Sequence, residues 1–184
     1  MLAVSAGAEA AIADQINALG ANLVMVTPAF GRGGFGSGSG GRPGLAYDDI
    51  GAIAENVTGI NGVSAEQSTT QDVKAGGNTI EDVSVVGTTA GFTQVRDYPV
   101  AIGRFLSDED NDRANKVIAL GYGLAEELFG DASGALGQKV KIGPNQYTVV
   151  GVMDTKGVVG STDYDARAYI PLTVYFKSFS NARF

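Results

Sequence analysis

The sequence predicts an α+β fold in which mixed or antiparallel sheets pack against a few helices. Strand-like and helix-like segments alternate along the 184 residues, but most neighbouring strands are joined by short turns, unlike those of a doubly wound parallel sheet. Hydrophobic residues make up 44% of the chain, which is enough for a substantial core. The sequence shows no internal repeat with a period of about 20 to 50 residues.

The N-terminal segment Ser5–Leu19 has the spacing of a helix. Ile12, Ile16 and Leu19 fall on one face at intervals of four and three residues, and a glycine follows as the stop. Such a helix could continue upstream as part of a longer one. The apolar segment Asn22–Pro28 that follows predicts a buried strand.

Residues 30–44, FGRGGFGSGSGGRPG, form a low-complexity segment. Glycine and serine lose much conformational entropy on ordering and offer few core contacts, so we expect a mobile loop. A phosphate-binding P-loop needs the pattern GxxxxGK[ST], and this segment contains no lysine. Phe30 and Phe35 leave a second role open, in which the loop contacts a partner.

A helix and a hairpin are expected next. Asp48 and Asp49 open the helix, where carboxylates suit the positive end of the helix dipole. The predicted buried face consists of Ile50, Ile53, Ala54 and Val57. Strands at Thr69–Lys74 and Thr79–Gly87 then form a hairpin, because two glycines between them permit a tight turn.

The second half of the chain predicts further short elements. In order, these are a short helix or turn within Gly91–Tyr98, one or two helical turns capped by Ser107, a strand at Lys116–Leu120, a helix at Tyr122–Phe129, a hairpin of Gln138–Ile142 and Gln146–Val152, a loop at Asp154–Asp165, a strand at Arg167–Leu172 and the start of a helix at Thr173–Phe179.

Composition excludes several classes of function. The net charge is −7 and the basic residues are scattered, which disfavours binding to nucleic acid or direct docking on anionic lipid. The chain has no cysteine and no histidine, which excludes disulfides, serine triads, cysteine proteases and ordinary zinc sites. It contains no run of about 20 apolar residues, and its first residues lack the basic and apolar regions of a signal peptide.

Two acidic clusters, Asp48-Asp49 and Asp108-Glu109-Asp110, are candidates for a divalent metal site or an acid–base pair. We favour the reading that both provide negative charge at helix N-termini. The sequence from Asp108 does not match the pattern of an EF-hand loop, because Arg113 stands where glycine is required and Ala119 where glutamate is required. A carboxylate-dependent enzyme remains an open alternative if these groups converge in a pocket.

Short motifs follow one another along nearly the whole chain. They are Ile16–Leu23 (INALGANL), Leu45–Asp49 (LAYDD), Val85–Thr88 (VVGT), Gly103–Leu106 (GRFL), Leu128–Gly130 (LFG), Val150–Val152 (VGV) and Ile170–Leu172 (IPL). Their order and spacing resemble the periplasmic core domain of MacB-like ABC transporter permeases, of the MacB/FtsX/LolC-type superfamily. Ala46 stands where threonine is common in that family. The positions that carry the resemblance, with structural rather than catalytic roles, are Gly20, Asn22, Gly103, Arg104, Phe105, Leu106, Leu128, Phe129, Gly130, Gly137 and Gly151.

The resemblance implies a domain placed between the first and second membrane helices of a permease. Residues 1–97 and 166–184 would form a porter-like subdomain that includes the flexible loop 30–44, and residues 98–165 would form a smaller inserted subdomain of the Sabre type. The helix at Ser5–Leu19 would continue the first membrane helix, and the segment from Thr173 would lead into the second. The domain would lie on the periplasmic or extracellular face of the cell membrane.

The resemblance also implies a function without catalysis, cofactor or metal in this domain. ATP would be hydrolysed by a separate nucleotide-binding domain or subunit, and the resulting movement would be transmitted through the paired permease copies. The expected partners are that ATP-binding unit, a second permease copy and a membrane-fusion adaptor or exported substrate, but no nucleic acid. The alternative is a sensor or scaffold domain of an FtsX-like permease that binds a peptide or a cell-wall hydrolase.

Overall fold

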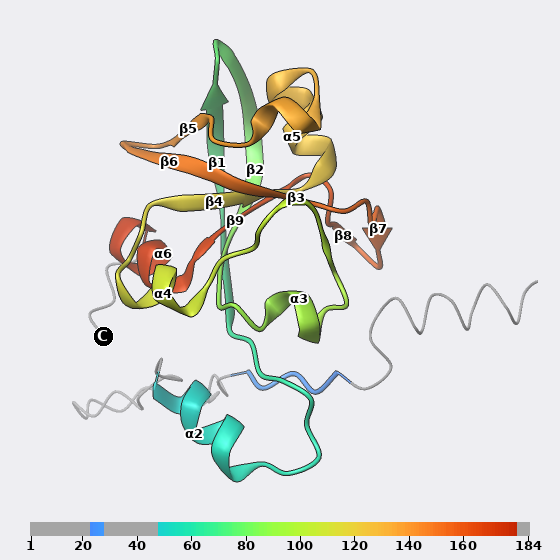
Figure 1. Cartoon of the computed structure of the whole chain (residues 1–184), viewed down its shortest axis with the longest axis vertical. Helices are drawn as coiled ribbons and strands as arrows, with labels where there is room; N and C mark the ends of the chain where they lie inside the picture. Colours follow the sequence, from blue (N-terminus) through green and yellow to red (C-terminus); the bar gives the residue numbers. More distant parts are fainter. Residues whose placement is uncertain (1–22, 28–47, 180–184) are drawn as a thin grey trace, which may run out of the picture.

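A computed structural model describes residues 23–27 and 48–179 of the chain (Figure 1). The elements in chain order are α2 (Asp48–Asn56), β1 (Glu66–Ala75), β2 (Asn78–Thr88), α3 (Phe92–Val95), β3 (Val100–Gly103), α4 (Asp108–Asp112), β4 (Val117–Leu120), α5 (Tyr122–Phe129), the 3₁₀ helix η1 (Ala132–Ala135), β5 (Lys139–Ile142), β6 (Asn145–Met153), β7 (Val158–Val159), β8 (Thr162–Asp163), β9 (Arg167–Pro171) and α6 (Leu172–Phe179).

Seven of these strands form one mixed sheet in the order β3-β6-β4-β9-β2-β1-β5. The β2–β9 and β4–β6 pairs are parallel, whereas β1–β2, β1–β5, β3–β6, β4–β9 and β5–β6 are antiparallel. The sheet closes on itself, because β5 pairs with β6 as well as with β1. Six strands therefore form a ring, and β3 extends the sheet beyond it along β6. The predicted α+β class with mixed strand pairing is confirmed.

The seven-stranded sheet contains strands from both predicted subdomains. β1, β2 and β9 come from outside residues 98–165, whereas β3, β4, β5 and β6 come from within them. The pairs β4–β9 and β1–β5 join the two groups in a single sheet. The predicted boundaries thus cross a continuous sheet, and the division into porter-like and Sabre-like parts stays a prediction.

The core has two clusters of buried side chains. The larger cluster joins the ring to α5 and α6, with members such as Val85, Leu120, Leu124, Tyr147 and Val174. The smaller cluster is aromatic and is built around Phe92, Tyr98 and Tyr169. Burial of these apolar surfaces is the main force that holds the short strands together.

The predicted buried strand at Asn22–Pro28 is wrong for the part that the structure describes. Residues 23–27 form no strand, and Val24 and Met25 are 82% and 69% exposed. A strand needs a free sheet edge to receive its backbone hydrogen bonds. The ring leaves one such edge on β1, which meets β5 only at Val73 and Lys74. Residues 23–27 do not pair with it.

The predicted helix after Tyr47 forms, but its predicted burial is wrong. Ile50 and Ile53 are half-buried, whereas Ala54 and Val57 are exposed. Figure 1 shows α2 below the sheet and separate from it. The apolar face is narrow and contains small residues, so it offers little area to bury against the ring.

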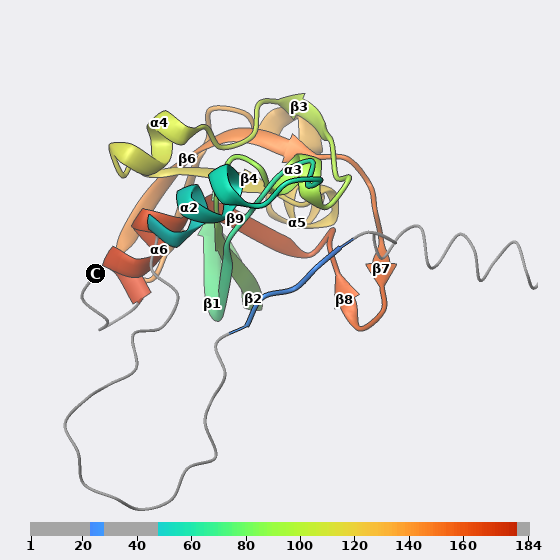
Figure 2. The same cartoon turned by 90° about the horizontal axis from the view of Figure 1, so that it is seen from below.

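Two smaller elements were not predicted. Strand β3, at Val100–Gly103, is only four residues long and starts directly after Pro99. The loop at Asp154–Asp165 contains the two-residue strands β7 and β8, which form a small hairpin at the side of the molecule (Figure 2). Such short segments carry too few residues for the alternation of a strand to be recognised.

Candidate interaction surface

The acidic cluster at Asp108-Glu109-Asp110 forms the start of α4, as predicted. Ser107 caps the helix: its hydroxyl accepts the Asp110 backbone N–H at 3.3 Å, and the Asp110 carboxylate accepts the Ser107 backbone N–H at 3.0 Å. This reciprocal pair is a capping box, with aspartate in the place of the usual glutamate. The predicted capping role of this cluster is therefore confirmed.

The Asp110 side chain accepts more hydrogen bonds than any other carboxylate of the described residues. It is almost fully buried and accepts hydrogen bonds from Arg104 at 2.6 Å, from the Ser107 hydroxyl at 2.9 Å and from Asn115 at 3.0 Å. Burial alone would raise its pKa, but these hydrogen bonds outweigh burial and hold the pKa of Asp110 well below its usual range. A carboxylate with all its acceptor positions in use supports the local structure and has no free position for a ligand.

The other acidic candidates do not join Asp110 in a pocket. Asp108 and Glu109 are exposed, and Glu109 pairs at 2.9 Å with Arg113, the residue that follows α4. Asp48 and Asp49 lie at the start of α2, which is well apart from α4 in Figure 1. Across residues 23–27 and 48–179, no group of three or more acidic side chains is placed to hold a metal ion.

Three of the positions that carry the resemblance lie where β3 leaves the sheet. Gly103 adopts a φ of +77°, and a side chain at Gly151 would collide with the Arg104 backbone carbonyl. These two glycines face each other across the β3–β6 pair and let the chain pass close to β6. Arg104 is thereby directed to Asp110.

The remaining positions of that set lie in the core or at turns. Leu106 and Leu128 are buried, and Phe105 and Phe129 pack against the two core clusters. The Phe105 ring stacks on Phe92 at a centroid distance of 5.7 Å. Gly130 and Gly137 have positive φ angles after α5 and η1, and Gly20 and Asn22 lie outside the described residues. None of the described residues of the set lines either of the two hollows found beside the β1–β5 pair.

A tyrosine cluster closes the loop that carries β7 and β8. The Tyr98 hydroxyl donates to the Asp165 carboxylate, which also accepts the backbone N–H groups of Lys156 at 2.8 Å and Gly157 at 3.0 Å. The Lys156 ammonium group lies over the rings of Tyr98 and Tyr164, at 5.6 and 5.5 Å from their centroids. Burial raises the pKa of the Tyr98 hydroxyl, which therefore stays protonated. This cluster holds the loop in place.

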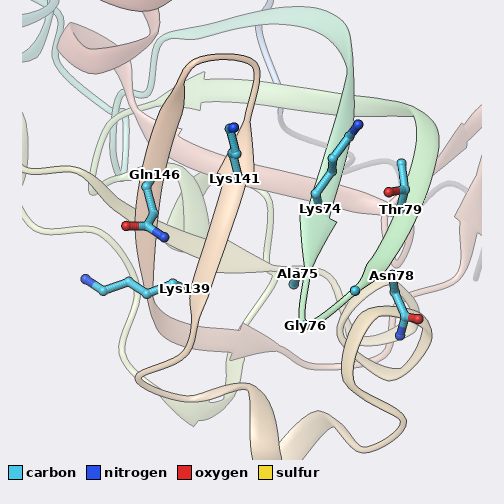
Figure 3. A pocket seen from close by; sticks show the side chains of 9 residues that line it. Lys74, Ala75, Gly76, Asn78, Thr79, Lys139, Lys141 and Gln146 are labelled. Carbon is cyan, nitrogen blue, oxygen red and sulfur yellow. The ribbon is translucent and has the colours of Figure 1, made fainter.

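A surface hollow of about 270 Å³ lies at the β1–β2 turn, beside β5 (Figure 3). Its lining includes Lys74, Lys139 and Lys141, together with the turn and Gln146 on β6. Figure 3 shows Lys74 and Lys141 extending side by side from neighbouring strands. We name these three residues the lysine hollow; an adjoining hollow of about 330 Å³ shares Lys74 and Lys141 with it.

The sequence alone does not reveal the lysine hollow. The sequence shows lysines at positions 139 and 141, which alternate as they would on the exposed face of a strand, but Lys74 is far away along the chain. Only the β1–β5 pairing brings Lys74 opposite Lys141. The hydropathy pattern does not specify this pairing.

The comparisons with known proteins agree on one family. The family model described as "MacB-like periplasmic core domain" matches residues 1–183. A macrolide export ATP-binding/permease protein MacB from Bdellovibrio bacteriovorus is 34% identical over 173 residues, which cover 94% of this chain and 26% of that protein. A pyoverdine export ATP-binding/permease protein PvdT from Pseudomonas entomophila is 30% identical, over 93% of this chain and 25% of its own length. The chain thus spans about a quarter of the length of these relatives.

Solved structures show the same fold. The periplasmic region of MacB from Actinobacillus actinomycetemcomitans superimposes with a TM-score of 0.62 at 18% identity, over 73% of this chain and 59% of that one. The extracellular domain of the transporter YknZ from Gram-positive bacteria gives a TM-score of 0.60 at 24% identity, over 73% of this chain and 66% of that one. No helix in the described ranges is long and apolar enough to cross a membrane. With a family model that matches almost every residue, the chain belongs to the family of MacB-like periplasmic core domains.

Proposed function

We propose that the chain is the extracytoplasmic domain of an ABC export permease, which transmits ATP-driven movement and docks an adaptor or the exported substrate. The observation that carries this proposal is the family match over residues 1–183, together with relatives whose names combine export, ATP binding and a permease. ATP hydrolysis would lie in a separate nucleotide-binding domain or subunit, since this chain covers only about a quarter of such relatives.

The way α6 is packed supports a role in transmitting movement. The Thr173 hydroxyl donates to the Asn111 carbonyl of α4 at 2.6 Å. Gly87 on β2 has no side chain, which lets Tyr175 of α6 lie directly on the strand. A displacement of α6 would therefore move α4 and the ring with it, because packed elements of a dense core shift as units. In a permease, α6 would lead toward the second membrane helix, and a second copy would complete the moving pair.

The proposal predicts that Glu127, an exposed residue on α5, lies outside the cytoplasm. The chain contains no cysteine, so Glu127→Cys introduces a single thiol into this domain. In the full-length permease with its other cysteines removed, we expect this thiol to react with a membrane-impermeant maleimide in intact cells whose outer membrane, where present, has been opened. The labelling rate should be unchanged when the inner membrane is permeabilised.

The control is Ala119→Cys, at a fully buried position of β4. This thiol should react only after the protein is unfolded, which shows that the reagent reports exposure of the folded domain. If Glu127→Cys reacted only after the inner membrane had been permeabilised, the proposed location would be refuted.

A further inference from the structure

The charge of the lysine hollow is opposite to that of the chain as a whole. The net charge is −7, yet three of the six lysines line this one recess. Within the described residues, the ion pairs are made by Arg96, Arg104 and Arg113, and none includes a lysine of the hollow. The nearest acidic lining residue is Asp72, in the adjoining hollow that shares Lys74 and Lys141. One carboxylate beside three ammonium groups leaves a net positive surface.

The strand pairing forces two of these lysines together. Lys74 and Lys141 are direct partners in the antiparallel β1–β5 pair, and both side chains are exposed. Like charges in directly opposite positions destabilise a sheet unless a counter-charge lies between them. A bound anionic group would remove this repulsion.

The spacing of the lysines indicates the form of the anionic partner. Lys139 and Lys141 are two residues apart on one strand, so their Cα atoms are separated by about 7 Å. An extended peptide presents alternate side chains on one face with the same repeat. Carboxylates at alternate positions of such a peptide would therefore meet Lys139 and Lys141 in turn, and Lys74 could reach the second of them.

The open rim of the hollow is suited to a polypeptide. Gly76 and Gly77 form the β1–β2 turn with positive φ angles, and a side chain built at either glycine would meet nothing within 4 Å. Asn78, at the end of this turn, donates its side-chain N–H to the Leu128 carbonyl of α5 at 2.8 Å, which links the turn to α5. The β1–β2 turn stands at the top of the molecule in Figure 1, whereas α6 lies well below it at the left.

We infer that the lysine hollow docks an extended acidic segment of a partner protein, with carboxylates at alternate positions. This inference rests on the proposed function and deepens it, since such a segment would belong to the adaptor or to another component of the export assembly. If α6 leads toward the membrane, the β1–β2 turn is directed away from it, which favours a protein partner over a lipid headgroup.

The test measures binding of a short fluorescent peptide in which Glu and Ser alternate, by fluorescence anisotropy with the 184-residue chain. We expect binding that weakens as salt is added, since exposed charge pairs are screened. The double variant K74Q/K141Q should weaken it by about tenfold, because each exposed ion pair contributes a factor of about 1.4 to 5 and these two act on one ligand. A peptide with Gln in place of Glu should bind at least tenfold more weakly than the Glu peptide, by the same estimate.

The matched control is R113Q/K177Q, which removes the same amount of charge at two exposed residues, one directly after α4 and one on α6. We expect this variant to change binding by less than about twofold. The inference is overturned if both double variants weaken binding equally, or if the Gln peptide binds as tightly as the Glu peptide. It is also overturned if phosphatidylglycerol vesicles or inorganic phosphate bind at this site and the Glu peptide does not.

Failure of this inference can be distinguished from failure of the proposed function. If the wild-type full-length permease captures its adaptor and K74Q/K141Q captures it equally well, the docking function stands and the lysine hollow is not its site. If the wild-type permease captures no adaptor, the proposed docking function fails. The peptide-binding measurement then tests separately whether the lysine hollow binds an acidic segment.

Discussion

Replacing Tyr169 with alanine is expected to lower the free energy of unfolding by about 3 to 5 kcal/mol. Tyr169 lies on β9 with no exposed surface. The centroid of its ring lies 5.0 Å from that of Phe92, 6.1 Å from that of Phe105 and 6.2 Å from that of Tyr98. Removing the ring leaves a cavity in the aromatic cluster and removes its contacts with these three neighbouring rings. Urea unfolding followed by tyrosine fluorescence and circular dichroism measures the loss.

The matched variant Tyr169→Phe keeps the ring and removes only the hydroxyl. That hydroxyl donates to the Tyr164 carbonyl at 3.4 Å, a long hydrogen bond. We expect a loss of about 1 kcal/mol or less for this variant. If Tyr169→Ala cost no more than Tyr169→Phe, the aromatic cluster would not be the packing centre that the structure shows.

Replacing Asp110 with alanine is expected to cost about 2 to 3 kcal/mol at neutral pH, because the helix cap and a charged hydrogen bond are lost together. Arg104 is half-exposed and can return to water, which limits the penalty for losing its partner. Urea unfolding at pH 7 measures the difference from the wild type. The double variant Asp108→Asn/Glu109→Gln is the control and should change stability by less than about 1 kcal/mol, since both side chains are exposed.

The contribution of Asp110 also depends on pH with a defined sign. Its pKa is lower in the folded than in the unfolded protein, so the folded state favours the ionised form. The stability that Asp110 provides is complete above its ordinary pKa of about 4 and is lost as the pH falls below that value. The difference between wild type and Asp110→Ala should therefore shrink below about pH 4. A difference that stayed constant with pH would contradict the assignment of the low pKa to this carboxylate.

Local signals predicted much of the fold. The glycine pair between β1 and β2, the serine cap of α4 and the glycine after α5 each determine the backbone over a few residues, and the structure has these features where the sequence predicts them. Gly130, for example, ends α5 with a φ of +77°, which a glycine adopts without steric cost. Such features depend on neighbours in the chain and can be read without knowledge of the tertiary structure.

Features that depend on distant pairing were not predicted. Closure of the ring needs β5 to pair with β1 as well as with β6. The β5–β6 hairpin was predicted, but no residue of β5 indicates the pairing with β1. The apolar run at Asn22–Pro28 has the composition of a buried strand, yet its described residues pair with no strand of the sheet. The lysine hollow was missed for the same reason, because Lys74 and Lys141 become neighbours only through the β1–β5 pair.

The central claim is that this domain moves when the permease binds ATP. The most direct measurement is the distance between spin labels at Glu127→Cys in the two copies of the full-length permease, by pulsed electron paramagnetic resonance. We expect the distance distribution to shift when ATP is added and to return after hydrolysis, and to stay unchanged in a variant that cannot bind ATP. The same distribution with and without ATP in the active permease would contradict the claim that the domain transmits ATP-driven movement.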